Sequence, residues 1–273
     1  MILQELLEQA KSLALAQNIP ETDFWFLISY YLHLSRSEII LSRQRILTDR
    51  EREIIENAFS RLEKGEPPQY ITGTAYFYGL DLKVNPAVLI PRPETERLVE
   101  LTIERLKGTE RILDIGTGSG AIAIALKHNL PSLNVSATEI SFSALETAKK
   151  NAEIYGADIH FYLSDCFPPV KQNYEVLISN PPYISKAEFA TLNSRIKDKE
   201  PVIALQGGED GLDFYRKLLS ESSEYLSENG FLALEHSDTQ KEAIMNLARK
   251  EGWTKIEPLK DLTDKDRYLF IYR

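Results

Sequence analysis

The chain has 273 residues, of which 43% are hydrophobic and 27% charged, a usual composition for one large or two smaller globular domains. Its net charge of −9 argues against broad binding to a phosphate backbone, and its single cysteine, Cys166, excludes an internal disulfide and fits a reducing compartment. No stretch approaches about 20 uncharged apolar residues, and the first residues lack the basic region of a secretory signal. We therefore expect a cytoplasmic protein with no membrane partner.

Residues 1–66 are predicted to form a small helical bundle. Leucine and alanine recur with the helical period over residues 2–17, and a second apolar stretch follows. Thr48 and Glu51 have the spacing of a capping box, in which each side chain bonds the other residue's backbone N–H. This box predicts a helix that runs to about Lys64, and the bundle is expected to have a core of its own.

Residues 67–90 are predicted to link this bundle to a second domain at residues 91–273. Tyrosine, phenylalanine and threonine gather around Gly79, which is typical of a β-hairpin. From Arg111 onward strand-like and helix-like segments alternate, which indicates an α/β fold with a mostly parallel sheet covered on both faces. The strands are expected at residues 111–116, 134–139, 159–165, 174–180, 230–236, 254–259 and 267–273.

The first motif with chemical content is D-I-G-T-G-S-G, where a predicted strand turns into a helix. Its glycines allow a tight turn and a close approach of the backbone to a ligand. The spacing differs from the G-x-G-x-x-G of dinucleotide sites, and Asp114 would repel a pyrophosphate but could pair with an ammonium group, directly or through water. This favours a ligand with an amino-acid tail. NAD binding and a glycine turn without a ligand remain as alternatives.

Two carboxylates follow the next two predicted strands. Glu139 can accept hydrogen bonds from both hydroxyls of a ribose, or it can simply precede the helix that begins near Ser141. Asp165 could accept a bond from an adenine amino group, or it could cap a loop. The neighbouring Cys166 is interpreted as a small hydrophobic residue beside the ligand rather than a nucleophile, because no base can be assigned to it.

The stretch L-I-S-N-P-P-Y-I-S places an amide, two prolines and an aromatic ring at the end of a strand. Proline lacks a backbone donor, so the strand must stop there, and ligands of open α/β sheets bind beyond such strand ends. A planar NH2 group could donate to the side-chain oxygen of Asn180 and to the carbonyl of Pro181, while Tyr183 offers a ring face. Two such acceptors aim the nitrogen lone pair at an electrophile, which is catalysis by positioning and fixed dipoles. A proline-rich loop without a ligand is the alternative.

Together, D-I-G-T-G-S-G, Glu139 and S-N-P-P-Y resemble the class I S-adenosylmethionine-dependent methyltransferases that act on planar nitrogen. The stretches Q-Y-I-T-G-T-A-Y-F-Y-G, V-L-I-P-R-P-E-T-E, E-P-V-I-A-L-Q-G-G-E-D-G-L-D-F-Y and D-L-T-D-K-D-R extend the resemblance over essentially the whole chain. They narrow it to the release-factor glutamine N5-methyltransferases of the PrmC/HemK type.

This resemblance implies a Rossmann-like domain with a mostly parallel seven-stranded sheet and a small N-terminal all-helical domain. It implies transfer of a methyl group from S-adenosylmethionine to the side-chain N5 of the glutamine in the Gly-Gly-Gln loop of class 1 peptide-chain release factors. The product would be S-adenosylhomocysteine, and the helical domain would help to hold the release factor.

Carried over by position, the resemblance assigns the cofactor to the glycine turn and the following strand ends, and the substrate amide to N-P-P-Y. The cofactor residues are Asp114, Gly116, Thr117, Gly118, Ser119, Gly120, Glu139, Asp165, Cys166 and Asn180. The amide pocket comprises Asn180, Pro181, Pro182 and Tyr183, with Asn180, Pro181 and Tyr183 as catalytic residues. Family members often carry an aromatic residue where Cys166 stands, so stacking on adenine would be weaker or supplied by Phe167. No specific role follows from chemistry for Arg92, Glu94 or Glu96 beyond an ion-paired structural one.

Three other functions fit part of the pattern. A ribosomal-protein glutamine methyltransferase is disfavoured by the R-P-E-T-E stretch, and a nucleic-acid adenine or guanine amino methyltransferase is disfavoured by the negative charge. A non-catalytic binding module is disfavoured by the intact glycines and Asn180. The four histidines and one cysteine show no metal-ligand spacing, so no metal is expected. We expect a monomer whose partner is a release factor, without direct contact to nucleic acid.

Overall fold

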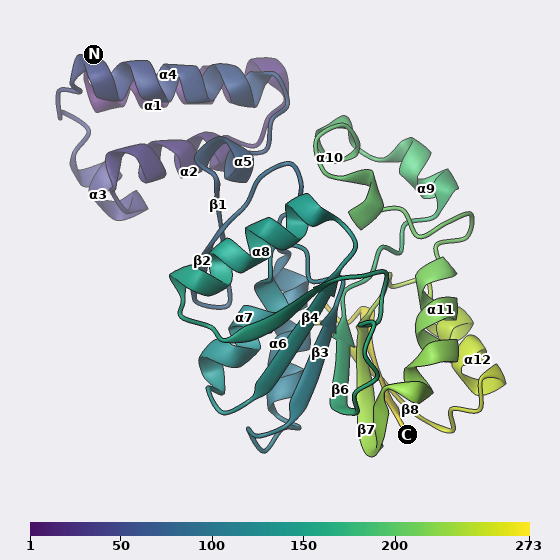
Figure 1. Cartoon of the computed structure of the whole chain (residues 1–273). Helices are drawn as coiled ribbons and strands as arrows, with labels where there is room; N and C mark the ends of the chain where they lie inside the picture. The colour runs from purple at the N-terminus through teal and green to yellow at the C-terminus, as the bar shows by residue number, and fades with distance from the viewer. The chain divides into compact units, whose positions relative to one another are not determined.

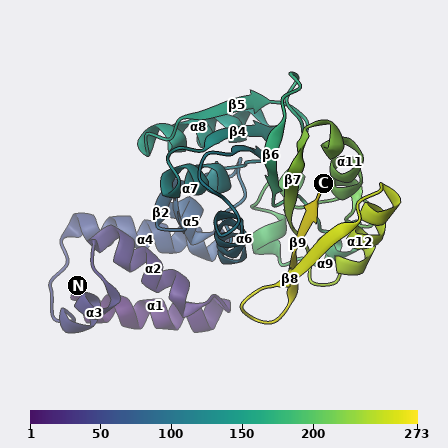
Figure 2. The same ribbon diagram turned by 90° about the horizontal axis from the view of Figure 1, so that it is seen from below.

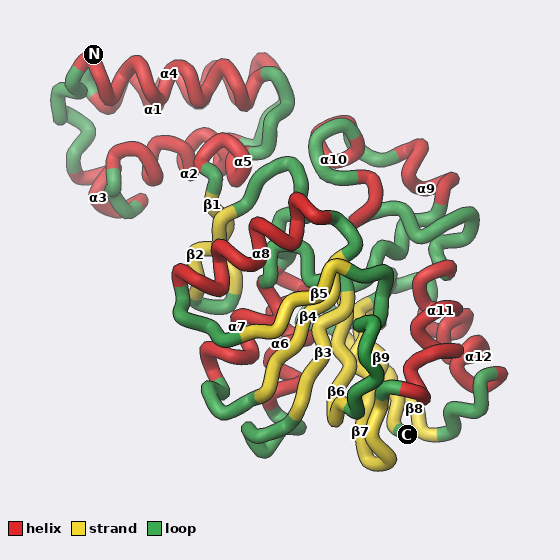
Figure 3. The backbone as a smooth tube through the Cα atoms, in the orientation of Figure 1, coloured by secondary structure: helices red, strands yellow, loops and turns green.

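The structure, a computed structural model, describes residues 1–273, which form two compact units at residues 1–74 and 75–273. The first unit consists of helices, whereas strands and helices alternate in the second (Figure 3). The helices of the first unit are α1 (Leu3–Gln17), α2 (Glu21–Leu32), α3 (Arg36–Leu41), α4 (Asp49–Glu63) and α5 (Pro68–Thr72). None of the helices in the chain combines the length and apolar character that crossing a membrane requires.

The first unit has a hydrophobic core of its own, as predicted. Its buried residues come from all five helices, and Phe24 of α2 meets Phe59 of α4 edge to face, with ring centroids 4.9 Å apart. The predicted capping box is present at the start of α4: the carboxylate of Glu51 accepts from the backbone N–H of Thr48 at 2.9 Å, and the Thr48 hydroxyl accepts from Glu51 N. Helices of this length are marginal alone, so this shared apolar core supplies most of their stability.

The segment predicted as a hairpin linker, residues 67–90, begins with a helix. Proline at the first helical position loses no hydrogen bond, so Pro68 starts α5 rather than ending regular structure. Ile71 of α5 is buried in the core of the first unit. The two units therefore divide after Thr74, whereas the predicted boundary lies after residue 66. The hairpin is shorter than predicted and comprises β1 (Thr74–Phe77) and β2 (Leu80–Lys83).

The second unit contains a seven-stranded sheet in the order β5-β4-β3-β6-β7-β9-β8. The pairs from β5 to β7 are parallel, and β9 runs antiparallel to both of its neighbours. This confirms the predicted mostly parallel seven-stranded sheet. The strands are β3 (Arg111–Ile115), β4 (Asn134–Glu139), β5 (Ile159–Leu163), β6 (Tyr174–Ser179), β7 (Leu226–Glu235), β8 (Lys255–Lys260) and β9 (Asp266–Tyr272).

Helices cover both faces of this sheet (Figures 1 and 2). Side chains of a strand alternate between faces, and the consecutive residues Ile112 and Leu113 of β3 accordingly belong to two different cores. One core includes α6 (Pro93–Ile103), α7 (Ala121–Asn129) and α8 (Phe142–Ile154), and the other includes α11 (Asp213–Glu221) and α12 (Lys241–Lys250). Four short helical segments are α9 (Lys186–Thr191), α10 (Ser194–Lys197), η1 (Val202–Ala204) and η2 (Ser222–Glu224).

The strand order changes direction between β3 and β6. The chain proceeds from β3 outward to β4 and β5, then returns to β6 on the opposite side of β3. The glycine turn follows β3 and N-P-P-Y follows β6, so both motifs lie at this topological switch point. The hydroxyl of Ser179, at the end of β6, donates to the carbonyl of Ile115, at the end of β3, at 2.7 Å. Ligands of open α/β sheets bind at such a point.

Candidate active site

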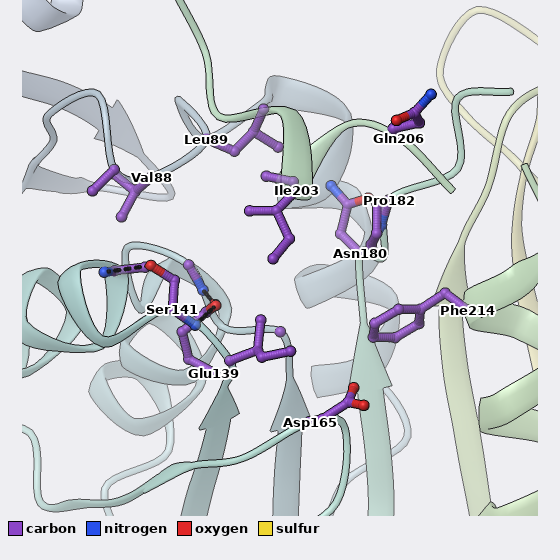
Figure 4. Close-up of a pocket in the computed structure, with 16 residues that line it drawn as sticks. Val88, Leu89, Glu139, Ser141, Asp165, Asn180, Pro182, Ile203, Gln206 and Phe214 are labelled. Atoms are coloured by element: carbon purple, nitrogen blue, oxygen red, sulfur yellow. Dashed lines mark hydrogen bonds between the residues drawn. The ribbon is translucent and has the colours of Figure 1, made fainter. Parts of the chain in front are cut away.

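Three pockets at the carboxyl ends of β3, β4 and β6 share Asn180 in their walls. The first pocket, with a volume of about 270 Å³, lies between the glycine turn, the end of β4 and the end of β6 (Figure 4). The second follows the glycine turn, and the third lies against the N-P-P-Y loop. Of the predicted site residues, Gly116, Gly118, Glu139, Asp165, Asn180 and Pro182 border the first pocket, Thr117 and Ser119 the second, and Pro181 and Tyr183 the third.

The glycines of the turn serve two purposes. Gly118 has a φ of +58°, and a Cβ added there would meet no atom within 4 Å, so the turn is open toward the pockets. Gly120 has a φ of +84°, and its Cβ would lie 2.8 Å from Cδ1 of Ile124 and 3.3 Å from Ala148. Gly120 borders none of the three pockets and instead lets α7 approach α8 closely. Gly118 and Gly120 both have a positive φ, a conformation that glycine adopts without strain.

Asp114 lies beneath the turn and is completely buried. Its Oδ2 accepts from the hydroxyl of Thr117 at 2.5 Å and from the backbone N–H of Ala123 at 3.2 Å. Burial raises the pKa of Asp114 to about 7. Its Oδ1 is buried without a hydrogen-bond partner, and such an oxygen favours a positively charged or hydrogen-donating neighbour.

Glu139, at the end of β4, is held by the backbone on both sides. Its Oε2 accepts from the N–H of Gly118 and its Oε1 from the N–H of Ser141, each at 2.9 Å. The side chain borders the first pocket, on the side opposite Asn180 (Figure 4). Each carboxylate oxygen has a second lone-pair direction, so this fixed carboxylate can accept further bonds from a diol.

Asp165 and Cys166 follow β5 but face different surroundings. The carboxylate of Asp165 borders the first pocket and accepts from Nζ of Lys217 at 2.6 Å, and this bond holds its pKa below the usual value. Cys166 has a φ of +67°, borders none of these three pockets, and is buried in the core beneath α11. Burial raises the pKa of its thiol to about 12, which leaves it protonated and unsuited to act as a nucleophile.

The aromatic ring at the first pocket belongs to Phe214 of α11, which the sequence did not single out. Phe167 instead stacks on Tyr225 within the core, with ring centroids 4.5 Å apart. Figure 4 shows Phe214 on the same side of the pocket as Asn180. The signal available in the sequence was the position of Phe214 in the first turn of a helix that begins two residues after the Gly-rich stretch Q-G-G-E-D-G.

The amide of Asn180 is oriented by a residue from a distant helix. Its Nδ2 donates to the hydroxyl of Thr95 at 2.9 Å, and this hydroxyl donates to Oε2 of Glu235 at 2.8 Å. With Nδ2 bound to Thr95, Oδ1 is the atom left to accept a bond from a ligand. Glu235 ends β7, and burial raises its pKa to about 7. Neither Thr95 nor Glu235 was predicted as a site residue.

Contacts from three other segments hold the loop after Asn180. Nε2 of Gln240 donates to the carbonyl of Tyr183 at 2.9 Å, and Ile184 pairs with Gln206 as an isolated parallel bridge. The Tyr183 ring packs against the core beneath α11 and borders the third pocket, and burial raises its pKa to about 12. The ring is therefore neutral and presents an aromatic surface to that pocket.

Arg92 has the ion-paired structural role that was expected for it from the sequence. Its guanidinium donates to both carboxylate oxygens of Glu200, at 2.6 and 2.7 Å, and Glu200 is almost completely buried. Glu96 accepts from the backbone N–H of Tyr78 at 2.9 Å and so fixes the hairpin turn. The Arg92 pair joins the start of α6 to the loop before η1, next to the second and third pockets.

Comparisons with known proteins agree with this arrangement. The family model "PrmC N-terminal domain" matches residues 5–73, and "Methyltransferase small domain" matches residues 95–209. The release factor glutamine methyltransferase of Streptococcus pneumoniae is 38% identical over 97% of this chain and 92% of its own length. That of Bacillus cereus is 34% identical over 99% of both chains. The chain belongs to the release factor glutamine methyltransferase family.

The fold of a solved relative agrees with this membership. The crystal structure of a methyltransferase from Pyrococcus furiosus matches 80% of this chain and 98% of its own, with a TM-score of 0.56 and 24% identity. The chain has the predicted class I methyltransferase fold and is an S-adenosylmethionine-dependent enzyme of this family.

The first two pockets fit S-adenosylmethionine in the chemistry of their walls. Gly118 leaves the turn open at the first two pockets, which gives room for an amino-acid tail. Asp114 borders neither pocket, but its buried carboxylate, with one unpartnered oxygen, lies beneath this turn and favours positive charge above it. Glu139 offers a fixed carboxylate for ribose hydroxyls, and Phe214 offers an apolar face beside Asp165 for a planar base. These contacts of individual residues with the cofactor remain predictions.

Proposed function

We propose that this enzyme methylates the side-chain N5 of the glutamine in the Gly-Gly-Gln loop of class 1 peptide-chain release factors. The observation that carries the proposal is the position of Asn180 in the walls of all three pockets. One side chain can thereby meet a methyl donor in the first two pockets and a substrate amide in the third. The names of the relatives from Streptococcus pneumoniae and Bacillus cereus support a release factor as the substrate.

In the proposed reaction a carboxamide NH2 enters the third pocket and donates to Oδ1 of Asn180 and to the carbonyl of Pro181. The lone pair of an amide nitrogen is delocalised, and two acceptors in the amide plane return electron density to the nitrogen and fix its direction. S-adenosylmethionine, when bound, supplies an electrophilic methyl group on a positively charged sulfur. The amide nitrogen bonds the methyl carbon as the carbon–sulfur bond breaks, and the nitrogen loses one proton to water.

The chain supplies no strong base at this point. Tyr183 is neutral at physiological pH because burial raises its pKa to about 12, and the thiol of Cys166 is equally neutral. The proton leaves only after the nitrogen has become cationic, when water suffices as acceptor. Catalysis therefore rests on orientation and on the fixed dipoles of two acceptors, as the sequence motif indicates.

Residues 1–74 are proposed to hold the body of the release factor while its loop reaches the pockets. In support, all residues that border the three pockets belong to the second unit, so the first unit is free for another task. We propose a monomer that binds no nucleic acid directly.

The proposal is tested by incubating the protein with methyl-labelled S-adenosylmethionine and a class 1 release factor, then digesting the release factor and mapping the label. Label is expected on the peptide that contains Gly-Gly-Gln, and not on a release factor whose loop glutamine is replaced by glutamate. Ribosomal proteins and RNA are tested in parallel. Label confined to a ribosomal protein, or to nucleic acid and lost at modest salt, would replace the proposed substrate with one of the alternatives.

A further inference from the structure

We propose that Thr95 and Glu235 are positioning residues that decide which end of the Asn180 amide faces the substrate. The three side chains form a line of hydrogen bonds between the end of β6, the first turn of α6 and the end of β7. Thr95 and Glu235 are 4% and 1% exposed, so water does not compete for these bonds. The inference rests on the proposed function only in taking a carboxamide NH2 as the group that Asn180 meets.

The orientation of this amide matters because its two ends have nearly the same shape but opposite hydrogen-bonding character. The oxygen of Asn180 accepts a bond from a substrate NH2 group, whereas its own NH2 would oppose that group with two donors. Steric fit cannot distinguish the two orientations, so the neighbours of the amide must do so.

The charge of Glu235 sets the direction of the line. An ionised carboxylate can only accept, so the single hydroxyl proton of Thr95 points toward Glu235. The Thr95 oxygen then has only lone pairs for Asn180, which must present Nδ2 to it and Oδ1 to the pocket. A protonated Glu235 can itself donate to Thr95, which frees the Thr95 proton to bond Oδ1 and allows the amide to turn over.

Charged groups from several elements surround Glu235. Arg267 of β9 and Arg92 before α6 favour the ionised carboxylate, Glu94 of α6 opposes it, and burial opposes it most strongly. Three tyrosines also face it and remain neutral, because burial raises their pKa values: Tyr183 of the N-P-P-Y loop, Tyr215 of α11, whose hydroxyl donates to the carbonyl of Glu235, and Tyr268 of β9.

The first test compares two substitutions of Thr95 with one at a matched threonine. Thr95→Val keeps the shape and removes the hydroxyl, and Thr95→Ser retains the hydroxyl. Thr102→Val is the control, because Thr102 is buried on the same helix but its hydroxyl donates to the carbonyl of Leu98. We expect Thr95→Val to lower kcat by about tenfold or more, the cost of a lost hydrogen bond to a group that acts in the transition state.

The pattern across these variants separates positioning from a general structural role. Thr95→Ser should restore most of the turnover lost in Thr95→Val, and Thr102→Val should turn over as the wild-type enzyme does. KM for the release factor should change by less than about threefold in all of them, because these variants leave the contacts that bind the substrate in its ground state unchanged. Turnover of Thr95→Val equal to that of Thr102→Val would overturn the inference.

A second test uses pH. Turnover of the wild-type enzyme is expected to rise as the pH increases through about 7, since ionised Glu235 holds the Asn180 amide with Oδ1 toward the pocket. Glu235→Gln cannot titrate, so its turnover should be lower than that of the wild-type enzyme at pH 8 and should lack this rise. An unchanged rise in Glu235→Gln would assign the pH dependence elsewhere and contradict the role of Glu235.

A third measurement needs no substrate and separates this inference from the proposed function. With ¹⁵N-labelled asparagine, the side-chain NH2 resonance of Asn180 is identified by its loss in Asn180→Ala. It should shift as the pH passes about 7 in the wild-type protein, and not in Glu235→Gln or Thr95→Val. If the resonance titrates but the methylation assay labels no release factor, the proposed function is contradicted and the positioning role is not. If the resonance titrates in the same way in both variants as in the wild-type protein, the positioning role is contradicted and the proposed function is not.

Discussion

Asn180 has little freedom in either its backbone or its side chain. Proline follows it, which disfavours the helical region for Asn180, and Nδ2 of Asn180 donates to the hydroxyl of Thr95. A preorganised acceptor of this kind costs no reorganisation when the reaction begins, which is why a neutral amide can contribute to catalysis. Under the proposed mechanism, replacement of Asn180 is therefore expected to lower turnover more than it lowers affinity for either ligand.

Asn180→Ala is accordingly expected to lower kcat by about 100-fold or more, the usual loss when one preorganised group is removed. Affinity for S-adenosylmethionine, measured by calorimetry, should remain within about threefold, because the glycine turn and Glu139 are untouched. Asn246→Ala, at an exposed position of α12, serves as the control. Near-normal turnover of Asn180→Ala would exclude the proposed acceptor role.

Glu235 also makes folding stability depend on pH. Its pKa is about 7 in the folded chain and about 4.5 when unfolded, so the folded state holds the proton more tightly. Stability contributed by this group is therefore present at low pH and is lost as the pH rises from about 4.5 to about 7. Urea unfolding at several pH values should show Glu235→Gln gaining stability relative to the wild-type chain across this window. Parallel stability curves would contradict the raised pKa.

At the scale of elements, the turn from β3 to α7 both borders the pockets and allows two helices to pack closely. Gly118 and Gly120 both have positive φ, but only Gly120 is crowded by α7 and α8. The two positions are two residues apart and differ mainly in what a methyl group would meet. They therefore offer a matched pair for separating backbone strain from steric conflict.

Gly118→Ala and Gly120→Ala should each lose about 1–2 kcal/mol of stability from the left-handed conformation. Gly120→Ala should lose more, because its Cβ would lie 2.8 Å from Cδ1 of Ile124. Gly118→Ala should bind S-adenosylmethionine more weakly while remaining folded, since its methyl group projects toward the pockets. Thermal unfolding and calorimetry measure the two effects, and equal melting temperatures would refute the packing role of Gly120.

At the scale of the whole molecule, each of the two units has a core of its own. The residues that border the pockets belong to residues 75–273 alone. This distribution supports the proposal that residues 75–273 carry out the reaction and residues 1–74 hold the protein substrate.

A fragment of residues 75–273 should bind S-adenosylmethionine with an affinity within about threefold of that of the full chain. Its KM for the release factor should rise by about tenfold or more, because the proposed substrate-holding unit is missing. Calorimetry and steady-state kinetics give the two values. An unchanged KM would remove the recognition role proposed for the helical unit.

Much of this fold could be predicted because its signals are local. Strand–helix alternation gave the sheet, and the Thr48–Glu51 box gave the start of α4. The short helix α5 was missed because Pro68 reads equally well as a helix start or as a break.

The support of the site could not be predicted, because it depends on contacts between distant elements. Thr95 is 85 positions from Asn180 and 140 from Glu235, and no spacing rule links them. Likewise, the neighbouring residues in the sequence do not show that the Phe167 ring packs in the core whereas the Phe214 ring borders the first pocket. Only tertiary packing decides which of two aromatic rings meets a ligand.

The shared wall at Asn180 has a consequence for the order in which ligands bind. In the proposed mechanism Asn180 contacts both ligands, so their binding shares a coupling free energy, and such coupling is reciprocal. The factor by which the methyl donor tightens the hold on the substrate peptide must equal the factor by which the peptide tightens the hold on the donor. The same equality holds for the product pair, so demethylated donor and methylated peptide must change each other's dissociation constants by one common factor.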